Sequence, residues 1–127
     1  MGRKAFTLVE LLIVVIILGI LAAVVIPQFS DASEDARLSS LTTNLQTIRG
    51  QIELYHIQYG VYPPEATFGT AMTTKGSTFG PYMQSIPNNP YTNTSTVATT
   101  AVGSSAWKYT VADGKFVAND TAPHAAY

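Results

Sequence analysis

Glu10 is the residue whose type and position most clearly suggest chemistry in this sequence. It is the only charged side chain among the 21 residues from Phe6 to Ile26, FTLVELLIVVIILGILAAVVI. A carboxylate inside a membrane costs about 2.5–3.5 kcal/mol on insertion scales, so it rarely persists there without a partner. The position therefore predicts a cation near Glu10, and a tolerated acid at the membrane interface is the alternative.

Motifs of known enzymes are absent from the sequence, which has no glycine-rich phosphate loop, no H-E-x-x-H and no G-x-S-x-G. Of the two histidines, His56 lies beside an apolar stripe, where packing or surface exposure is expected, and His124 lies in a tail. A net charge of −1, with 12% charged residues and no cysteine, indicates neither a nucleic-acid-binding surface nor a disulfide framework. We therefore expect that the chain is not an enzyme and that nucleic acid is not its main partner.

The apolar run from Phe6 to Ile26 is long enough to cross a bilayer, because as a helix it would extend about 31 Å. Basic residues precede it at positions 3 and 4, and none follows until Arg37. This bias predicts an N-terminus in the cytoplasm, with everything after Pro27 outside. A secretory signal is disfavoured, since its apolar region is shorter and ends in a small-x-small cleavage site that this run lacks.

The processing site of type IV prepilins and type II secretion pseudopilins is similar to one stretch of this chain, Lys4-Ala5-Phe6-Thr7-Leu8-Val9-Glu10-Leu11-Leu12-Ile13-Val14. These families have a short basic leader, a cut before Phe, and then Thr-Leu-(Ile/Val)-Glu-Leu. The resemblance implies a leader over residues 1–5, cleavage between Ala5 and Phe6 by a prepilin peptidase, and methylation of the new Phe6 amine. It also implies that Glu10 is the acid that contacts other subunits. The families usually have Gly where this chain has Ala5, and alanine is the smallest alternative, so we expect cleavage to be retained.

A cut before Phe6 would supply the cation that Glu10 needs. The new α-amino group would lie four residues, about 6 Å, from Glu10 along a helix. In a polymer, the amine of an incoming subunit can be neutralised by the Glu10 of a subunit already in place, and at low dielectric this contact favours one axial register. We therefore expect Phe6 and Glu10 to take part in subunit assembly.

Gly19 and Pro27 are helix-weakening residues, and they fall where the pilin-like families also have such residues. Glycine lowers helix propensity by about 1 kcal/mol relative to alanine, and proline removes a backbone donor and crowds the preceding turn. We expect a bend near Pro27 and a segment between the two residues that extends or unwinds when a subunit leaves the lipid. The alternative is that Pro27 simply marks the membrane exit.

Residues 28–59 have the periodicity of an amphipathic helix. The apolar residues at alternating spacings of three and four are Leu38, Leu41, Leu45, Ile48, Ile52, Tyr55 and Tyr59. Gly60 and the pair Pro63-Pro64 form a stop signal, so we expect one long helix over about 6–59. A coiled-coil seam is the alternative use of the stripe, but packing on a sheet is favoured because the C-terminal part is rich in predicted strands that need covering.

The C-terminal part predicts a small antiparallel sheet of about three strands. Between Ala106 and Asn119, strand-like runs flank Asp113-Gly114, which predicts a hairpin. The Thr- and Val-rich segment 94–102 is the expected third strand, with residues 103–105 as the connection. The predicted fold class is therefore α+β and pilin-like, with the C-terminal half of the long helix packed on this sheet.

The segment 60–93 is rich in Thr, Gly and Pro and is predicted to be a loop, with a short helix around 66–74. Residues 80–90, GPYMQSIPNNP, resemble the loop of G-type major pseudopilins, in which a Gly-Pro-Tyr run is followed by spaced prolines. The expected organisation is a leader over 1–5, a membrane and filament-core helix over 6–27, and a head over 28–127. Within the head we expect the helix 28–59, this loop, a β region over 94–120 and a tail over 121–127.

Asp113, Asn119 and Asp120 carry oxygen atoms of the kind that calcium binds. Some G-type pseudopilins hold calcium in this region, but the spacing of these three residues fits no recognised calcium loop. Hydrogen bonding within turns is the alternative role. No cofactor is expected, and calcium is the one metal that the sequence raises.

Together these features predict a structural subunit of a type IV pilus-like filament, which polymerises through its hydrophobic N-terminal helix. Such a chain begins as a single-pass protein of the inner (cytoplasmic) membrane and ends in a periplasmic or cell-surface filament, either a secretion pseudopilus or a type IV pilus. The resemblance implies as partners further copies of the chain, membrane lipid, the prepilin peptidase, an inner-membrane assembly platform and an assembly ATPase. The alternative is a membrane-anchored binding module that does not polymerise.

Overall fold

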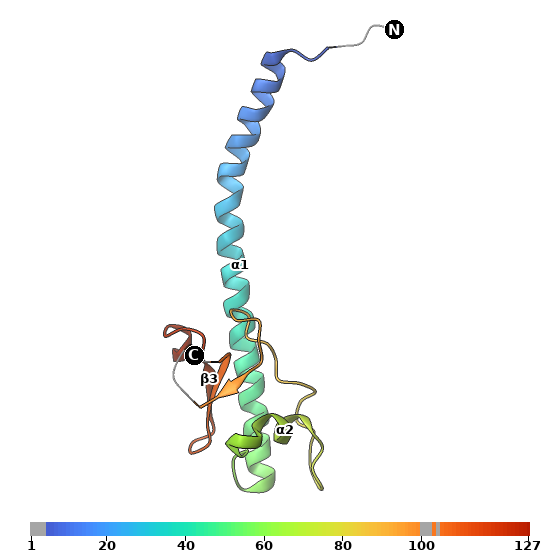
Figure 1. Cartoon of the computed structure of the whole chain (residues 1–127), viewed down its shortest axis with the longest axis vertical. Helices are drawn as coiled ribbons and strands as arrows, with labels where there is room; N and C mark the ends of the chain where they lie inside the picture. The colour runs from blue at the N-terminus through green and yellow to red at the C-terminus, as the bar shows by residue number, and fades with distance from the viewer. Residues whose placement is uncertain (1–4, 100–102, 104) are drawn as a thin grey trace. The chain divides into compact units, whose positions relative to one another are not determined.

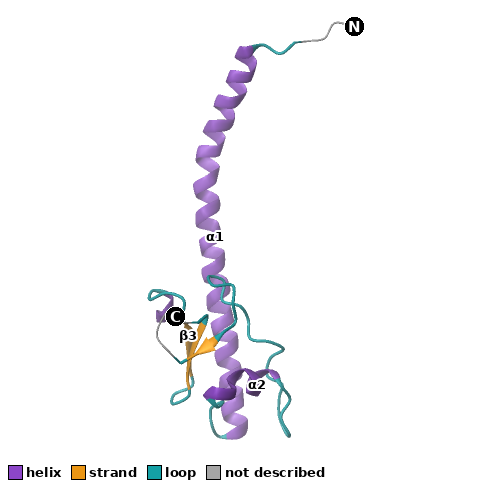
Figure 2. Ribbon diagram, in the orientation of Figure 1, coloured by secondary structure: helices purple, strands orange, loops and turns teal. Residues whose placement is uncertain are grey.

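The computed structural model describes residues 5–99, 103 and 105–127, apart from the side chain of Pro27. Its contacts divide the chain into two units, Met1–Ala36 and Arg37–Tyr127. The expected long helix is present as α1 (Leu8–Tyr59), which is assigned as helix without interruption. Figures 1 and 2 follow the elements along the chain. The described residues leave out most of the expected leader and part of the expected third strand and its connection. The side chain of Pro27 is also left out, so its expected role is not described.

In the first unit, α1 carries apolar side chains on every side. All residues from 5 to 26 are exposed, including Leu8 at 80% and Ile20 at 63%. A helix that is apolar all round is stable when a membrane or a larger assembly surrounds it. By length and composition, α1 contains a stretch that could cross a membrane.

The end of α1 is fixed by the predicted stop signal. Gly60 takes a φ of 73°, and its N–H donates to the carbonyl oxygen of His56 at 2.8 Å. A left-handed residue directly after the last turn is a common C-terminal cap, and glycine adopts it without a Cβ clash. The chain then turns into the loop that begins with Pro63 and Pro64.

The second unit has one core, formed where the last turns of α1 meet the strands and the short helix α2 (Phe68–Thr73). From α1, the apolar stripe contributes Leu41, Leu45, Ile48 and Ile52. The other large buried side chains are Phe68, Met72, Trp107, Tyr109 and Phe116. The stripe therefore packs within the head, as predicted, and a coiled-coil seam is not needed to explain it.

The sheet has three strands in the order β1 (Val97–Ala98), β2 (Trp107–Thr110) and β3 (Lys115–Ala118). The predicted hairpin is confirmed, since β2 and β3 pair antiparallel from Trp107 opposite Ala118 to Thr110 opposite Lys115. In the turn between them, Asp113 Oδ1 accepts the Lys115 N–H at 3.1 Å, and Gly114 has a φ of 67°.

The prediction that all three strands are antiparallel is wrong, because β1 pairs parallel to β2. The pairing covers only Val97 opposite Trp107 and Ala98 opposite Lys108. So short a strand has little pattern of its own. Its direction is instead set by contacts with Thr96, whose carbonyl oxygen accepts the Trp107 N–H at 2.9 Å and whose hydroxyl accepts the Ala106 N–H at 3.1 Å.

The loop after α1 contains the predicted short helix, as η1 (Glu65–Thr67) followed by α2. Further along, the fully buried Asn89 connects this loop to the rest of the head. Its Nδ2 donates to the carbonyl oxygen of Ala106 at 2.9 Å, and its Oδ1 accepts the Tyr91 N–H at 2.9 Å. The predicted tail contains one further turn, η2 (His124–Ala126).

Candidate assembly site

The start of α1 is capped by a reciprocal contact between Thr7 and Glu10. The Thr7 hydroxyl donates to Glu10 Oε2 at 2.8 Å, and the Thr7 backbone N–H donates to the same oxygen at 2.8 Å. In return, the Glu10 backbone N–H donates to Thr7 Oγ1 at 3.2 Å. This is a capping box, in which a Thr before the helix and a Glu three residues later satisfy each other's backbone groups.

The capping box fixes where the Glu10 carboxylate lies relative to the helix start. Because Thr7 supplies two donors to one carboxylate oxygen, the side chain folds back toward the N-terminus, where the partial positive charge of the helix also favours an anion. Phe6, the residue expected at the new N-terminus, is 77% exposed beside it. This role of Thr7 was not predicted, although the sequence contains the Thr-x-x-Glu signal of a capping box.

Of the other expected assembly residues, Gly19 lies within α1, and no atom outside its chain neighbours and its own helical backbone lies within 4 Å of the position that a Cβ would take. It therefore makes no close approach to another part of the chain that would require a glycine. Position 27 is assigned as helix, so α1 continues on both sides of the proline. Whether the segment between them extends during assembly stays a prediction.

The three candidate calcium ligands do not come together in the described structure. Asp113 precedes β3, whereas Asn119 and Asp120 follow it, so a strand about 13 Å long separates them. Asp113 caps its own turn, and Asn119 Nδ2 donates to the Ser105 hydroxyl at 2.8 Å. Among the described residues, no group of three or more His, Asp or Glu side chains could hold a metal. Calcium binding by Asp113, Asn119 and Asp120 stays a prediction.

Asp120 instead joins the tail to the rest of the head, through a polar cluster that was not predicted from the sequence. Its Oδ2 lies 2.5 Å from His124 Nδ1, and its Oδ1 accepts Asn89 Nδ2 at 3.0 Å. The His124 ring also packs on Tyr91, with ring centroids 4.0 Å apart. Burial raises the pKa of Asp120, but the hydrogen bonds from His124 and Asn89 outweigh it and leave the pKa below its ordinary value.

The capped acid, the apolar helix and the small head together define a class of protein. A capped acid opens the N-terminal part of α1, which is exposed and apolar on every side, and the last turns of the same helix pack in a small α+β head. Large exposed apolar surfaces mark sites of membrane or protein interaction. The class is a small α+β protein whose N-terminal helix is stable when lipid or other chains surround it.

Comparison with known proteins agrees with this class. The family described as Prokaryotic N-terminal methylation motif matches residues 1–26. The fimbrial protein EcpC of Eikenella corrodens is 31% identical over 121 residues, which cover 90% of this chain and 79% of that protein. The type II secretion system core protein G of Vibrio cholerae is 30% identical over 98 residues, covering 72% of this chain and 67% of that protein. The type IV major pilin protein PilE1 of Neisseria gonorrhoeae is 33% identical over 84 residues, covering 66% of this chain. No solved structure is significantly similar.

The chain belongs to the type IV pilin-like family. The family consists of structural pilin and pseudopilin subunits. The chain spans only 39% and 50% of the lengths of two gonococcal pilins that it matches.

Proposed function

We propose that this chain is a structural subunit of a type IV pilus-like filament and has no catalytic activity of its own. The observation that carries the proposal is the N-terminal part of α1, which is exposed and apolar on every side and contains a single capped acid, Glu10. A permanent membrane anchor gains nothing from a carboxylate at this depth, because the charge costs insertion energy. A helix that later packs among copies of itself gains a defined partner for that charge.

The first step in the proposed function is processing in the inner membrane. The precursor crosses the membrane once, with its basic N-terminal residues in the cytoplasm, and a prepilin peptidase cuts between Ala5 and Phe6 and methylates the Phe6 amine. The cut leaves a cation immediately before the capping box. Its α-amino group and the Glu10 carboxylate then lie at nearly the same depth.

The second step is extraction from the lipid and polymerisation. The amine of an incoming subunit pairs with the Glu10 carboxylate of a subunit already in place, and in a medium of low dielectric this contact selects one register. The apolar helices form the core of a periplasmic or cell-surface filament. An inner-membrane assembly platform and an assembly ATPase supply the docking and the energy. Gly19 and Pro27 let the intervening segment of the helix extend as it leaves the membrane.

The experiment that tests the proposed function combines two measurements on cells with an active prepilin peptidase. Mass spectrometry of the N-terminus from membranes should find a chain that begins at a methylated Phe6. Electron microscopy of material sheared from the cells, or released from the periplasm, should find filaments that contain the chain. A chain that keeps Met1 or Gly2 in such cells contradicts the proposal, and so does a processed chain that never forms a polymer.

A further inference from the structure

Outside the apolar N-terminal segment, the most exposed large apolar side chain in the described residues is Ile57, at 78%. It belongs to the last turns of α1, in the head. Leu54, one turn earlier on the same side of the helix, is also exposed, at 40%. Two neighbouring exposed apolar side chains on one side of a helix offer a partner a small apolar surface to cover. We refer to Leu54 and Ile57 as the apolar knob.

Gly50 lies seven residues before Ile57 and therefore on nearly the same side of α1. A glycine inside a helix lowers stability by about 1 kcal/mol relative to alanine and usually has a packing reason. Within this chain Gly50 has none, because no atom outside its chain neighbours and its own helical backbone lies within 4 Å of the position its Cβ would take. A glycine next to the apolar knob leaves room for a partner to approach the helix closely.

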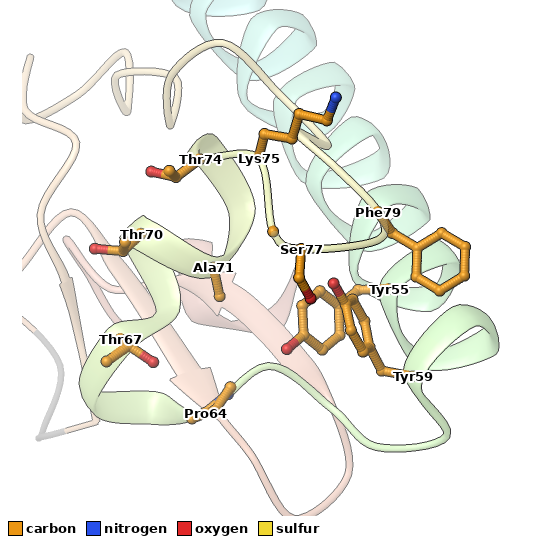
Figure 3. Close-up of a pocket in the computed structure, with 11 residues that line it drawn as sticks. Tyr55, Tyr59, Pro64, Thr67, Thr70, Ala71, Thr74, Lys75, Ser77 and Phe79 are labelled. Atoms are coloured by element: carbon orange, nitrogen blue, oxygen red, sulfur yellow. The ribbon is translucent and has the colours of Figure 1, made fainter.

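A hollow of about 380 Å³ lies elsewhere on the same head, where α1 meets the loop after α2. Its wall on the α1 side is made of two tyrosine rings, Tyr55 and Tyr59, with centroids 4.5 Å apart. Phe79 meets Tyr59 edge to face at 5.4 Å on the loop side. Figure 3 shows the Ser77 hydroxyl pointing toward the tyrosine rings and the Lys75 ammonium pointing away from them. The aromatic rings therefore form one wall of the hollow, and polar groups elsewhere in its lining come from Thr67, Thr70, Thr74, Lys75 and Ser77.

The knob and the hollow lie on different sides of α1, so one subunit cannot fill its own hollow with its own knob. At 100° per residue, Tyr55 and Tyr59 lie on one face of the helix, and Ile57 lies between them in sequence and about 180° away around the axis. The burial agrees, because Ile52 on the tyrosine side is 1% exposed. Only a second chain can bring the two surfaces together.

We propose that the apolar knob of one subunit inserts into the aromatic hollow of the next subunit when the filament forms. The occupant is a second copy of this chain, since the chain carries both halves of the contact. A contact between two different surfaces of identical subunits repeats head to tail and generates an open helical polymer, whereas a contact between identical surfaces stops at a dimer. The inference rests on the proposed filament function and names the head contact that the apolar helices alone do not specify.

The decisive experiment is site-directed cross-linking in assembled filaments. The chain has no cysteine, so every thiol in the sample is an introduced one. Cells that process and assemble the chain should co-produce two single variants, Ile57→Cys and Ser77→Cys. Oxidation of the mixed filaments should give a covalent dimer, because a disulfide forms only between Cα atoms less than about 7 Å apart. Filaments of either variant alone are the controls and should give no dimer.

The outcomes separate this inference from the proposed function. If the unmodified chain forms no filament, the proposed function fails. If the mixed variants form filaments without the covalent dimer, the proposed function stands and the knob contact is wrong. A dimer in filaments of Ile57→Cys alone also overturns the inference, because it places two knobs against each other.

A charge at the knob gives a second readout. Ile57→Lys should lower the amount of sheared filament by about tenfold or more, which is the scale for losing one buried aliphatic side chain at an interface. Val111→Lys is the matched control. Val111 is an exposed apolar residue too, at 39%, but it lies in the turn between β2 and β3 and not on α1. The control should assemble normally. Equal yields from the two variants contradict the inference.

Discussion

The Thr7 hydroxyl and the Glu10 carboxylate are joined at 2.8 Å, and the Glu10 backbone N–H returns a hydrogen bond to the same hydroxyl at 3.2 Å. The acid proposed to meet the next subunit is therefore also the residue that closes the cap of its own helix. These two roles depend on different properties of the side chain. Capping needs a hydrogen-bond acceptor, whereas pairing with an amine needs a negative charge.

Glu10→Gln should separate the two roles. Glutamine keeps an acceptor oxygen and is the usual alternative to glutamate in a capping box, so the helix start should be preserved. Its amide has no charge to offer an incoming Phe6 amine. We expect normal cleavage and methylation but at least a tenfold loss of filament, measured by N-terminal mass spectrometry and by immunoblotting of sheared material. Glu10→Ala should lose the filament as well, and normal filament yield from either variant would refute the pairing role.

Thr7→Val should weaken assembly by a smaller amount. Valine has the shape of threonine but no hydroxyl, so the Glu10 carboxylate loses one donor and the helix loses its cap, at a cost of about 1 kcal/mol. That cost corresponds to roughly a fivefold decrease in filament yield if the capped state is the one that assembles. Thr7→Ser keeps the hydroxyl and should restore the yield. A normal yield from Thr7→Val would mean that the cap has no part in assembly.

Much of the fold could be predicted because its signals are local. The apolar stripe from Leu38 to Ile52 repeats at helical spacing, and Gly60 ends the helix by a conformation that only glycine adopts easily. The turn at Asp113-Gly114 likewise combines a side chain that accepts a backbone N–H with a residue of positive φ. Each of these features depends on neighbours in sequence, so the sequence alone was enough.

The parts that were missed depend on contacts between distant residues. Asn89 in a Pro- and Asn-rich loop is typical of turn chemistry, and nothing nearby predicts that its side chain contacts both the carbonyl oxygen of Ala106 and the carboxylate of Asp120. The parallel direction of β1 was missed for the same reason, since it rests on two hydrogen bonds that Thr96 accepts from Ala106 and Trp107. The role of Thr7 is different, because the local Thr-x-x-Glu signal of a capping box was present in the sequence. The same residues also carry the family resemblance, and only that resemblance was interpreted.

Phe116→Ala should be among the most destabilising changes in the head. Phe116 is fully buried, and its ring centroid lies 5.6 Å from that of Trp107 and 5.5 Å from that of Phe68. Losing so large a buried side chain costs about 3–5 kcal/mol of unfolding free energy. Trp107 is the only tryptophan, so its fluorescence reports unfolding of the head during denaturation of the full chain in detergent. Val111→Ala at the exposed turn is the control and should change stability by less than about 0.5 kcal/mol.

Gly114→Ala should destabilise the head for two separable reasons. The φ of 67° costs an alanine about 1–2 kcal/mol, and the new Cβ would clash with the Tyr62 ring. In a Tyr62→Ala background the clash is absent and only the backbone cost remains. The unfolding free energy should therefore fall less on adding Gly114→Ala to Tyr62→Ala than on adding it to the unmodified chain. Equal losses in the two backgrounds would rule out the contact with Tyr62.

Asp120→Asn should remove part of the loss of stability in acid. Burial raises the pKa of Asp120, but His124 and Asn89 lower it by more, so the native carboxylate stays charged at a pH where an unfolded one is already protonated. A carboxyl group with a lowered native pKa contributes stability above its unfolded pKa of about 3.9, and this contribution is lost as the pH falls through the native value. The unmodified head should therefore lose unfolding free energy as the pH falls below about 4, as measured by Trp107 fluorescence. Asp120→Asn should be less stable at neutral pH and should lose less stability on acidification, because its amide does not titrate.

Glu65→Gln is the control. Glu65 is at an exposed position outside this cluster, so this variant should retain the full dependence of stability on pH. If Asp120→Asn also retains it, the carboxylate does not hold the tail to the head through its charge.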